Sequence, residues 1–242
     1  MPKTAGILII GNEVLSGKVA DQNGPYLTRE LRALGVDVRR ISVIPDEVPT
    51  IVEEVRRFAG AYDLVFTTGG VGPTHDDVTM AAVAEAFARP LVRHSTLEAV
   101  LRQHFGVDIT PAQLRMADIP GGGRLVGEGE MSFPVVAVGN VFVFPGIPET
   151  VRRKFGRIRE QFRDRPYVLR RVYLTCDEGE IAQQLHELLG RFPALQLGSY
   201  PIVGESDHTV LLTLESLDGD YVEAALGDLL DRLPAASIAR VE

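Results

Sequence analysis

The chain has 242 residues, 45% of them hydrophobic, which is enough for a medium-sized domain with its own core and a second, smaller one. Its net charge of −8 would repel a polyanion and no run of Lys or Arg offsets that charge locally, so nucleic acid is not an expected partner. With one cysteine (Cys176), no signal-peptide pattern and no apolar stretch near the ~20 residues of a membrane helix, we expect a cytoplasmic protein without a membrane partner.

Short apolar runs alternate with amphipathic segments over the first quarter of the chain. Gly35 is placed to end the first helix and Pro49 to precede the second, so these helix-boundary residues agree with the spacing of the apolar residues. The order β-α-β-α-β predicts a parallel sheet flanked by helices. The segments are strand 5–10, helix 26–34, strand 36–43, helix 51–59 and strand 64–67.

The next segments predict three helices and a hairpin. The helices are expected at 78–87, 95–105 and 111–116, the last with Thr110 and Gln113 in capping-box positions. Two apolar runs, 135–138 and 141–144, flank Gly139-Asn140 and predict a two-residue turn. A Pro-rich loop then leads into a basic helix that ends near Arg163.

A change in the order of predicted strands and helices at residues 164–166 indicates a domain boundary. The following order is β-α-β-β-α-β, which is that of a ferredoxin-like fold. We therefore expect an α/β domain with a mostly parallel sheet over 1–164 and a small α+β ferredoxin-like domain over 165–242. The segments are strand 167–175, helix 180–192, strands 195–200 and 208–217, helix 221–233 and strand 237–241.

Four loops that follow strands carry the residues suited to ligand binding. In an open α/β sheet, ligands bind beyond the carboxyl ends of the strands, and parallel strands bring those ends to one edge. The candidate residues for substrate or phosphate binding are Gly11, Asn12, Glu13, Thr68, Gly69, Gly70, Gly72, Pro73, Thr74, Pro145, Gly146 and Glu149. Asp46 follows the second strand and belongs to the same edge.

The loop 68–77 is the most specific of these features. Its three glycines let the backbone approach a ligand and direct N–H groups toward it, and the helix that follows adds its positive dipole end. Thr67, Thr68 and Thr74 add hydroxyl donors. Asp76 and Asp77 would repel a phosphate unless a divalent cation lay between them, which indicates Mg²⁺ or a related metal.

Structural alternatives remain open for both central aspartates. Asp77 could cap the following helix while the glycines form a tight turn. Asp46 could complement the dipole of the next helix, because Asp-Glu-Val-Pro is a good helix-entry sequence. Glu13 favours a functional role, since a carboxylate directly after a buried strand needs a polar partner.

Several other patterns point away from familiar sites. Residues 11–18 resemble a phosphate-binding Walker loop, but five residues instead of four separate its glycines and Val19 replaces the metal-binding hydroxyl. No Gly-x-Gly-x-x-Gly follows the first strand, and the histidines lack metal-ligand spacing. We interpret Cys176 as a packing residue and the Arg152-Arg153-Lys154 cluster as a solvated helix face.

Two stretches together carry a family resemblance. Gly-Gly-Val-Gly-Pro-Thr-His-Asp-Asp-Val-Thr from residue 69, with Gly-Asn-Glu-Val-Leu-Ser-Gly-Lys-Val-Ala-Asp-Gln-Asn from residue 11, resembles the three-layer MoaB/Mog molybdopterin-binding domain in its CinA-type (competence/damage-inducible protein A) branch. The resemblance covers residues 1 to about 160. Residues 133–149, together with 198–201, are similar to the N-terminal part of eukaryotic-type FAD synthases.

The resemblance implies a choice between two chemistries on one fold. Mog-type members adenylylate molybdopterin, whereas CinA-type and FAD-synthase-type relatives hydrolyse the pyrophosphate of ADP-ribose or FAD with a divalent metal such as Mg²⁺, Mn²⁺ or Co²⁺, often aided by K⁺. It implies metal and phosphate handling by Asp46 and Asp77, and Glu13 matches the acidic position of the first loop. In the pyrophosphatase hypothesis, Asp46 and Asp77 are the catalytic residues, and Asp46, Asp76 and Asp77 hold the metal. Neither deamidation nor FAD synthesis is expected of this chain.

The leading hypothesis is therefore a metal-dependent nucleotide pyrophosphatase of the CinA type. A molybdopterin-binding adenylyltransferase of molybdenum cofactor biosynthesis and a non-catalytic nucleotide-binding protein are the alternatives. The expected partners are a small nucleotide or pterin and further copies of the chain in a homo-oligomer.

Overall fold

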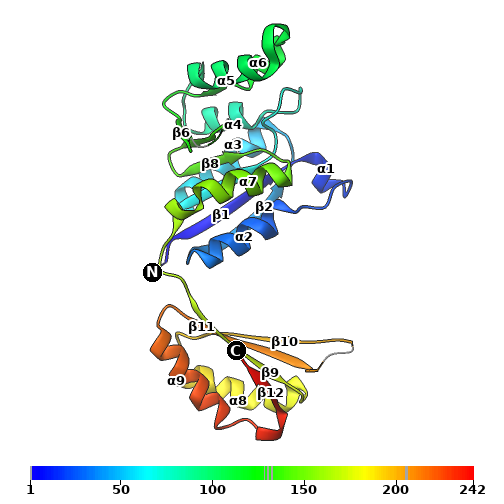
Figure 1. Ribbon diagram of the computed structural model, residues 1–242, viewed down its shortest axis with the longest axis vertical. Helices are drawn as coiled ribbons and strands as arrows, with labels where there is room; N and C mark the ends of the chain where they lie inside the picture. Colours follow the sequence, from blue (N-terminus) through cyan, green and yellow to red (C-terminus); the bar gives the residue numbers. More distant parts are fainter. Residues whose placement is uncertain (1, 128, 130, 132, 205–206) are drawn as a thin grey trace. The chain divides into compact units, whose positions relative to one another are not determined.

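The computed structural model describes residues 2–127, 129, 131, 133–204 and 207–242, which form two compact units, Met1–Asp164 and Arg165–Glu242 (Figure 1). In the first unit the strands are β1 (Thr4–Ile10), β2 (Asp37–Ile44), β3 (Leu64–Thr68), β4 (Leu91–Arg93), β5 (Asp118–Pro120), β6 (Arg124–Val126), β7 (Val135–Val138) and β8 (Val141–Phe144). Its α-helices are α1 (Asn12–Leu15), α2 (Asn23–Ala33), α3 (Val48–Ala61), α4 (Thr79–Ala86), α5 (Ser95–Phe105), α6 (Pro111–Arg115) and α7 (Pro148–Ile158). Two 3₁₀ turns, Gly106–Asp108 and Arg159–Phe162, follow α5 and α7.

The main sheet of the first unit is mostly parallel, as predicted. Its strand order is β2-β1-β3-β8-β7-β6 over the described residues. The pairings β1–β2, β1–β3 and β3–β8 are parallel, and β7 pairs antiparallel with both of its neighbours, β8 and β6. The carboxyl ends of β1, β2, β3 and β8 therefore meet at one edge, where the four candidate loops begin.

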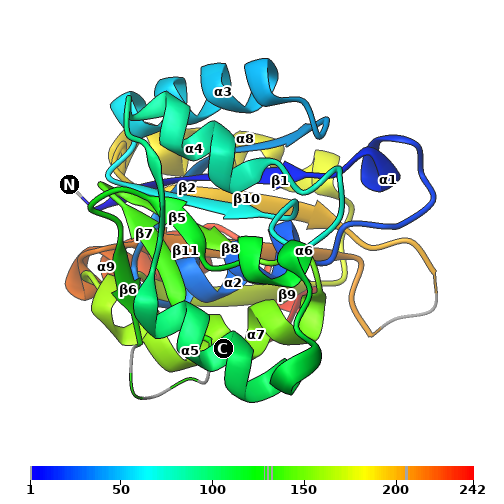
Figure 2. The same ribbon diagram turned by 90° about the horizontal axis from the view of Figure 1, so that it is seen from above.

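Helices cover both faces of this sheet and give the expected three layers. Figure 2 shows α3 and α4 on one side of the strands and α7 on the other. Leu27 and Leu31 of α2 pack with Phe155 of α7 against one face, whereas Ile51 of α3 and Val83 of α4 pack against the other. The buried strands read as nearly continuous apolar runs because both of their faces are covered.

The second unit has the ferredoxin-like order that the sequence predicted. Its sheet is antiparallel, in the order β10-β11-β9-β12. Residues of both helices, including Ile181, Leu188, Val222 and Leu229, share one core with the strands. The elements are β9 (Val168–Leu174), α8 (Glu178–Arg191), β10 (Gln196–Pro201), β11 (Val210–Ser216), α9 (Gly219–Leu230), the 3₁₀ turn Ala235–Ser237 and β12 (Ile238–Val241).

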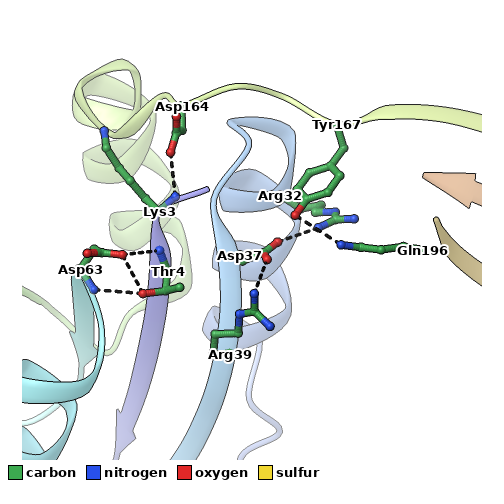
Figure 3. A network of polar contacts seen from close by, with 9 residues as sticks. All are labelled: Lys3, Thr4, Arg32, Asp37, Arg39, Asp63, Asp164, Tyr167 and Gln196. Atoms are coloured by element: carbon green, nitrogen blue, oxygen red, sulfur yellow. Dashed lines mark hydrogen bonds and ion pairs between the residues drawn. The ribbon is translucent and has the colours of Figure 1, made fainter. Parts of the chain in front are cut away.

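Polar contacts fasten the two ends of the first unit together (Figure 3). The backbone N–H of Lys3 donates to the Asp164 carboxylate at 2.7 Å, and the Asp164 N–H donates to the carbonyl of Leu34 at 2.8 Å. Beside them, the N–H and hydroxyl of Thr4 both donate to Asp63 at 2.8 Å. The Thr4 hydrogen bonds lower the pKa of Asp63 because they favour its charged form.

The predicted elements differ from the structure mainly where segments are short. The expected loop after the first strand contains the one-turn helix α1, and the three-residue strands β4, β5 and β6 were not predicted. The basic helix α7 ends at Ile158 rather than near Arg163. The hairpin turn is confirmed, since Val138 pairs with Val141 and Gly139 has a φ of 57°, as is the Thr110–Gln113 capping box. No helix in the described part of the chain is long and apolar enough to cross a membrane.

Candidate functional site

One cavity of about 630 Å³ lies at the carboxyl edge of the main sheet. It takes residues from three of the four candidate loops, and it adds apolar side chains and two cations that come from other elements. The candidates that line it are Glu13, Gly69, Gly70, Gly72, Pro73, Asp77, Pro145 and Gly146. Thr74 lines a smaller compartment of about 170 Å³ that shares Gly70, Gly72 and Asp77 with the first.

The glycine loop fits its place only because it lacks side chains. A Cβ on Gly69, whose φ is 105°, would lie 2.0 Å from the backbone carbonyl oxygen of Ile10. A Cβ on Gly70, whose φ is 63°, would meet the Thr79 hydroxyl at 2.4 Å. That hydroxyl donates to the carbonyl of Gly69 at 2.9 Å, and the Thr79 N–H donates to the carbonyl of Gly70 at 2.9 Å. The start of α4 thus fixes the loop against the end of β1.

Asp77 orients this loop rather than capping the helix after it. Its carboxylate accepts the backbone N–H of Thr74 at 2.8 Å and also the Thr74 hydroxyl. No side-chain hydrogen bond caps α4, so the structure does not show the capping alternative. Asp76 lies outside the cavity with its side chain 57% exposed, and the Thr74 hydroxyl lowers the pKa of Asp76.

Asp46 and the first candidate loop are joined by one hydrogen bond. The Asp46 carboxylate accepts the backbone N–H of Asn12 at 2.8 Å, and its other oxygen lies 3.6 Å from the Cβ position of Gly70. The backbone N–H of Gly11 donates to the carbonyl of Ile44, which ties the ends of β1 and β2 together. Asp46 therefore lies behind the glycine loop, while Glu13 reaches the cavity.

The remaining candidates have other surroundings. Thr68 is buried and its hydroxyl oxygen accepts from Asn23, and Thr67 is fully buried without a hydrogen-bond partner for its hydroxyl among the described atoms. Glu149 is exposed and does not line the cavity. Neither threonine is among the cavity-lining residues, so the backbone of the loop, rather than its first hydroxyls, faces a ligand.

Two residues at the candidate site, Asn23 and Lys154, were not predicted from the sequence. Asn23 at the start of α2 is buried and donates to the carbonyl of Gly146 at 2.8 Å, so it holds the loop that follows β8. Lys154 is only 8% exposed and, together with Arg153, lines the cavity. The interpretation of residues 152–154 as a solvated face is thus wrong for Lys154. The spacing of Val151, Lys154 and Phe155 on one helical face was the available signal.

Two carboxylates of the cavity are the candidates for holding a cation together with a ligand. No group of three His, Cys, Asp or Glu side chains suited to hold a metal forms within the described residues. Mg²⁺ in nucleotide sites is commonly held by one or two carboxylates together with substrate phosphates. Glu13 and Asp77 both line the cavity and could supply such a set.

Comparison with known families divides the chain at the same place as its fold. The model described as "Probable molybdopterin binding domain" matches residues 6–164. The model described as "FAD synthase, middle domain" matches residues 166–242.

Two individual relatives match over more than nine tenths of the chain, and one solved structure matches over about two thirds of it. A "Probable FAD synthase" of Caenorhabditis elegans is 30% identical over 96% of this chain and 50% of its own length, so the chain spans about half of that relative. A protein of Archaeoglobus fulgidus is 34% identical over 91% of this chain and 93% of its own. The crystal structure of the protein CinA with unknown function from Thermoplasma acidophilum has a TM-score of 0.61 at 30% identity, covering 66% of this chain and 98% of that one.

Proposed function

The chain belongs to the family of the probable molybdopterin binding domain, and from this premise we propose that it is a metal-dependent nucleotide pyrophosphatase of the CinA type. The proposed substrates are ADP-ribose and FAD. The observation that carries the proposal is the single cavity in which a glycine loop, two carboxylates and two cations meet. That combination suits a ligand with a diphosphate in its middle.

The size and lining of the cavity support a nucleotide ligand. Its volume of about 630 Å³ falls within the ~300–1,000 Å³ of small-molecule sites. Met80, Val136 and Val143 give part of it an apolar wall, against which a flat heterocycle could pack. The glycine loop offers backbone N–H groups to phosphate oxygens, and Arg153 and Lys154 add positive charge.

Asp77 and Glu13 are the residues best placed to hold the divalent cation, because both line the cavity. Asp46 lies behind the glycine loop and Asp76 is more exposed, so these two are less well placed. When bound, such a cation supplies charge neutralisation and Lewis-acid activation at the diphosphate. The Thr74 N–H and hydroxyl keep Asp77 oriented toward the loop. Hydrolysis adds a water oxygen to phosphorus and breaks the P–O–P linkage, giving AMP with ribose 5-phosphate or with FMN.

The test is a hydrolysis panel with FAD and ADP-ribose, each with Mg²⁺, Mn²⁺ or Co²⁺ and with or without K⁺. We expect turnover with at least one pair and its loss in Asp77→Asn. Asp76→Asn is the matched comparison, because it removes the same charge from the neighbouring residue, whose side chain is exposed. This variant should retain most of the activity. A wild-type protein inert across the panel would contradict the proposal.

Adenylylation of molybdopterin is a second candidate because the family model itself carries the name of that ligand. Incubation with ATP and molybdopterin, followed by a search for the adenylated product, separates it from pyrophosphate hydrolysis. Tight nucleotide binding in calorimetry without turnover under any metal would instead favour a non-catalytic binding protein. A cytoplasmic location and a homo-oligomeric state belong to the proposed function too, and light scattering on the purified protein tests the second.

A further inference from the structure

Lys154 is a buried titratable group that adds positive charge to the proposed site but has no assigned contact with the ligand. It lies in the middle of α7, where Val151, Phe155 and Ile158 face the hydrophobic core on the same side of the helix. Its side chain extends from that packed face to the cavity that the glycine loop also lines. The packing of this helical face therefore holds the backbone of Lys154 beside the cavity.

The ammonium group of Lys154 has few partners within the protein. It donates a long hydrogen bond to the carbonyl of Pro134, at 3.4 Å, and its nitrogen lies 4.9 Å from the centre of the Phe133 ring. No carboxylate in the described ranges of the chain forms an ion pair with it. An ammonium carries three donors, and a buried charge without a counter-ion is costly. Burial, followed by the nearby charge of Arg153, lowers the pKa of Lys154 to about 8.

We propose that Lys154 is an anion-binding residue of this cavity and that its ammonium group binds a phosphate oxygen of the ligand. The glycine loop, between β3 and α4, contributes neutral backbone donors, and Lys154 contributes a charged donor from α7. A phosphate in the cavity would supply the counter-ion that the buried ammonium lacks. The nature of the phosphate ligand rests on the proposed function, but the contact itself does not require turnover.

The first test measures ADP binding by calorimetry in the presence of Mg²⁺ at about pH 7. Lys154→Met removes the charge and keeps an unbranched side chain, and it should weaken ADP binding by about tenfold or more. Arg157→Met is the matched control, because it removes a cation from an exposed position of the same helix away from the cavity. Equal ADP affinity in Lys154→Met and wild type would overturn the assignment, as would a wild-type protein that binds no ADP.

A pH titration of wild type gives a second readout that does not depend on a variant folding. ADP affinity should fall as pH rises from about 7 to about 9, because the free protein then loses the Lys154 proton. Arg153, Glu13 and Asp77 also line the cavity, so the dependence belongs to Lys154 only if Lys154→Met flattens it. A wild-type affinity that does not change over this range would overturn the proposal.

The two proposals fail in different ways. If wild type hydrolyses its substrate and Lys154→Met keeps the wild-type KM and ADP affinity, the Lys154 assignment is wrong and the proposed activity stands. If wild type binds ADP through Lys154 but hydrolyses neither FAD nor ADP-ribose, the proposed activity is wrong and the assignment stands.

Discussion

At the scale of single residues, Lys154 links stability to pH. Its folded-state pKa of about 8 lies below the ordinary 10.5, so the unfolded chain holds this proton more tightly. The charged lysine therefore destabilises the fold below pH 8, and this cost disappears as pH rises toward 10.5. We expect Lys154→Met to be more stable at neutral pH by on the order of 2–3 kcal/mol, as measured by urea unfolding. The difference in unfolding free energy between Lys154→Met and wild type should shrink at high pH. A difference that stays constant with pH would contradict the prediction.

Gly69 gives a second residue-scale prediction, with a control inside the chain. Gly69→Ala places a Cβ 2.0 Å from the backbone oxygen of Ile10 at a φ of 105°, so neither group can move cheaply. We expect a loss of about 2–4 kcal/mol in the free energy of unfolding. Gly60→Ala, in helix α3 with no atom within 4 Å of its Cβ, should instead gain up to about 1 kcal/mol. Chemical denaturation of both variants measures the contrast, and similar losses would contradict it.

A residue of the site could be predicted from the sequence where the residues next to it in the chain identify it. The glycine loop, Glu13 and Asp77 could be selected because each belongs to a loop that follows a strand, and strand ends in a parallel sheet converge. Lys154 and Asn23 could not be selected in that way. Their roles depend on which helical face is buried and on a carbonyl more than a hundred residues away.

At the scale of elements, Asn23 fixes the position of a cavity-lining loop. Its side-chain amide donates to Gly146 at 2.8 Å and lies 3.4 Å from the Thr68 hydroxyl, in a buried place at the start of α2. Asn23→Ala should cost about 0.5–1.5 kcal/mol because the part-buried carbonyl of Gly146 loses its hydrogen bond. It should also raise KM in the hydrolysis assay. Gln22→Ala, at the exposed neighbouring residue, should change neither the free energy of unfolding nor KM. Equal effects of Gln22→Ala and Asn23→Ala would argue against a specific role of Asn23.

The elements also show the physical limit of prediction from sequence. β1, β3, β7 and β8 were found because burial on both faces leaves an apolar run that local composition reveals. The three-residue strands β4, β5 and β6 have no room for a periodic pattern. They form because other strands pair with them: Leu91 of β4 pairs with Pro120 of β5, and Arg124 of β6 pairs with Ala137 of β7. Such pairing is a tertiary effect that no short window of sequence contains.

At the scale of the whole molecule, the chain consists of two units with separate hydrophobic cores. Among the described residues, the first unit contains three clusters of buried side chains, and the second has one that joins α8 and α9 to its own strands. Units with separate cores can unfold independently. The residues that line the cavity all lie between Glu13 and Lys154, so the first unit supplies the chemistry proposed for the chain.

This arrangement predicts that residues 2–164 alone bind and hydrolyse the same ligands as the full chain. The hydrogen bonds that fasten Lys3 and Leu34 to Asp164 lie within that segment, so its ends should stay in place after truncation. We expect kcat and KM within about threefold of the full chain, and two calorimetric unfolding transitions in the full chain against one in the truncated form. A truncated protein that gives a cooperative transition but has lost more than about tenfold in kcat/KM would mean that the ferredoxin-like unit takes part in the site.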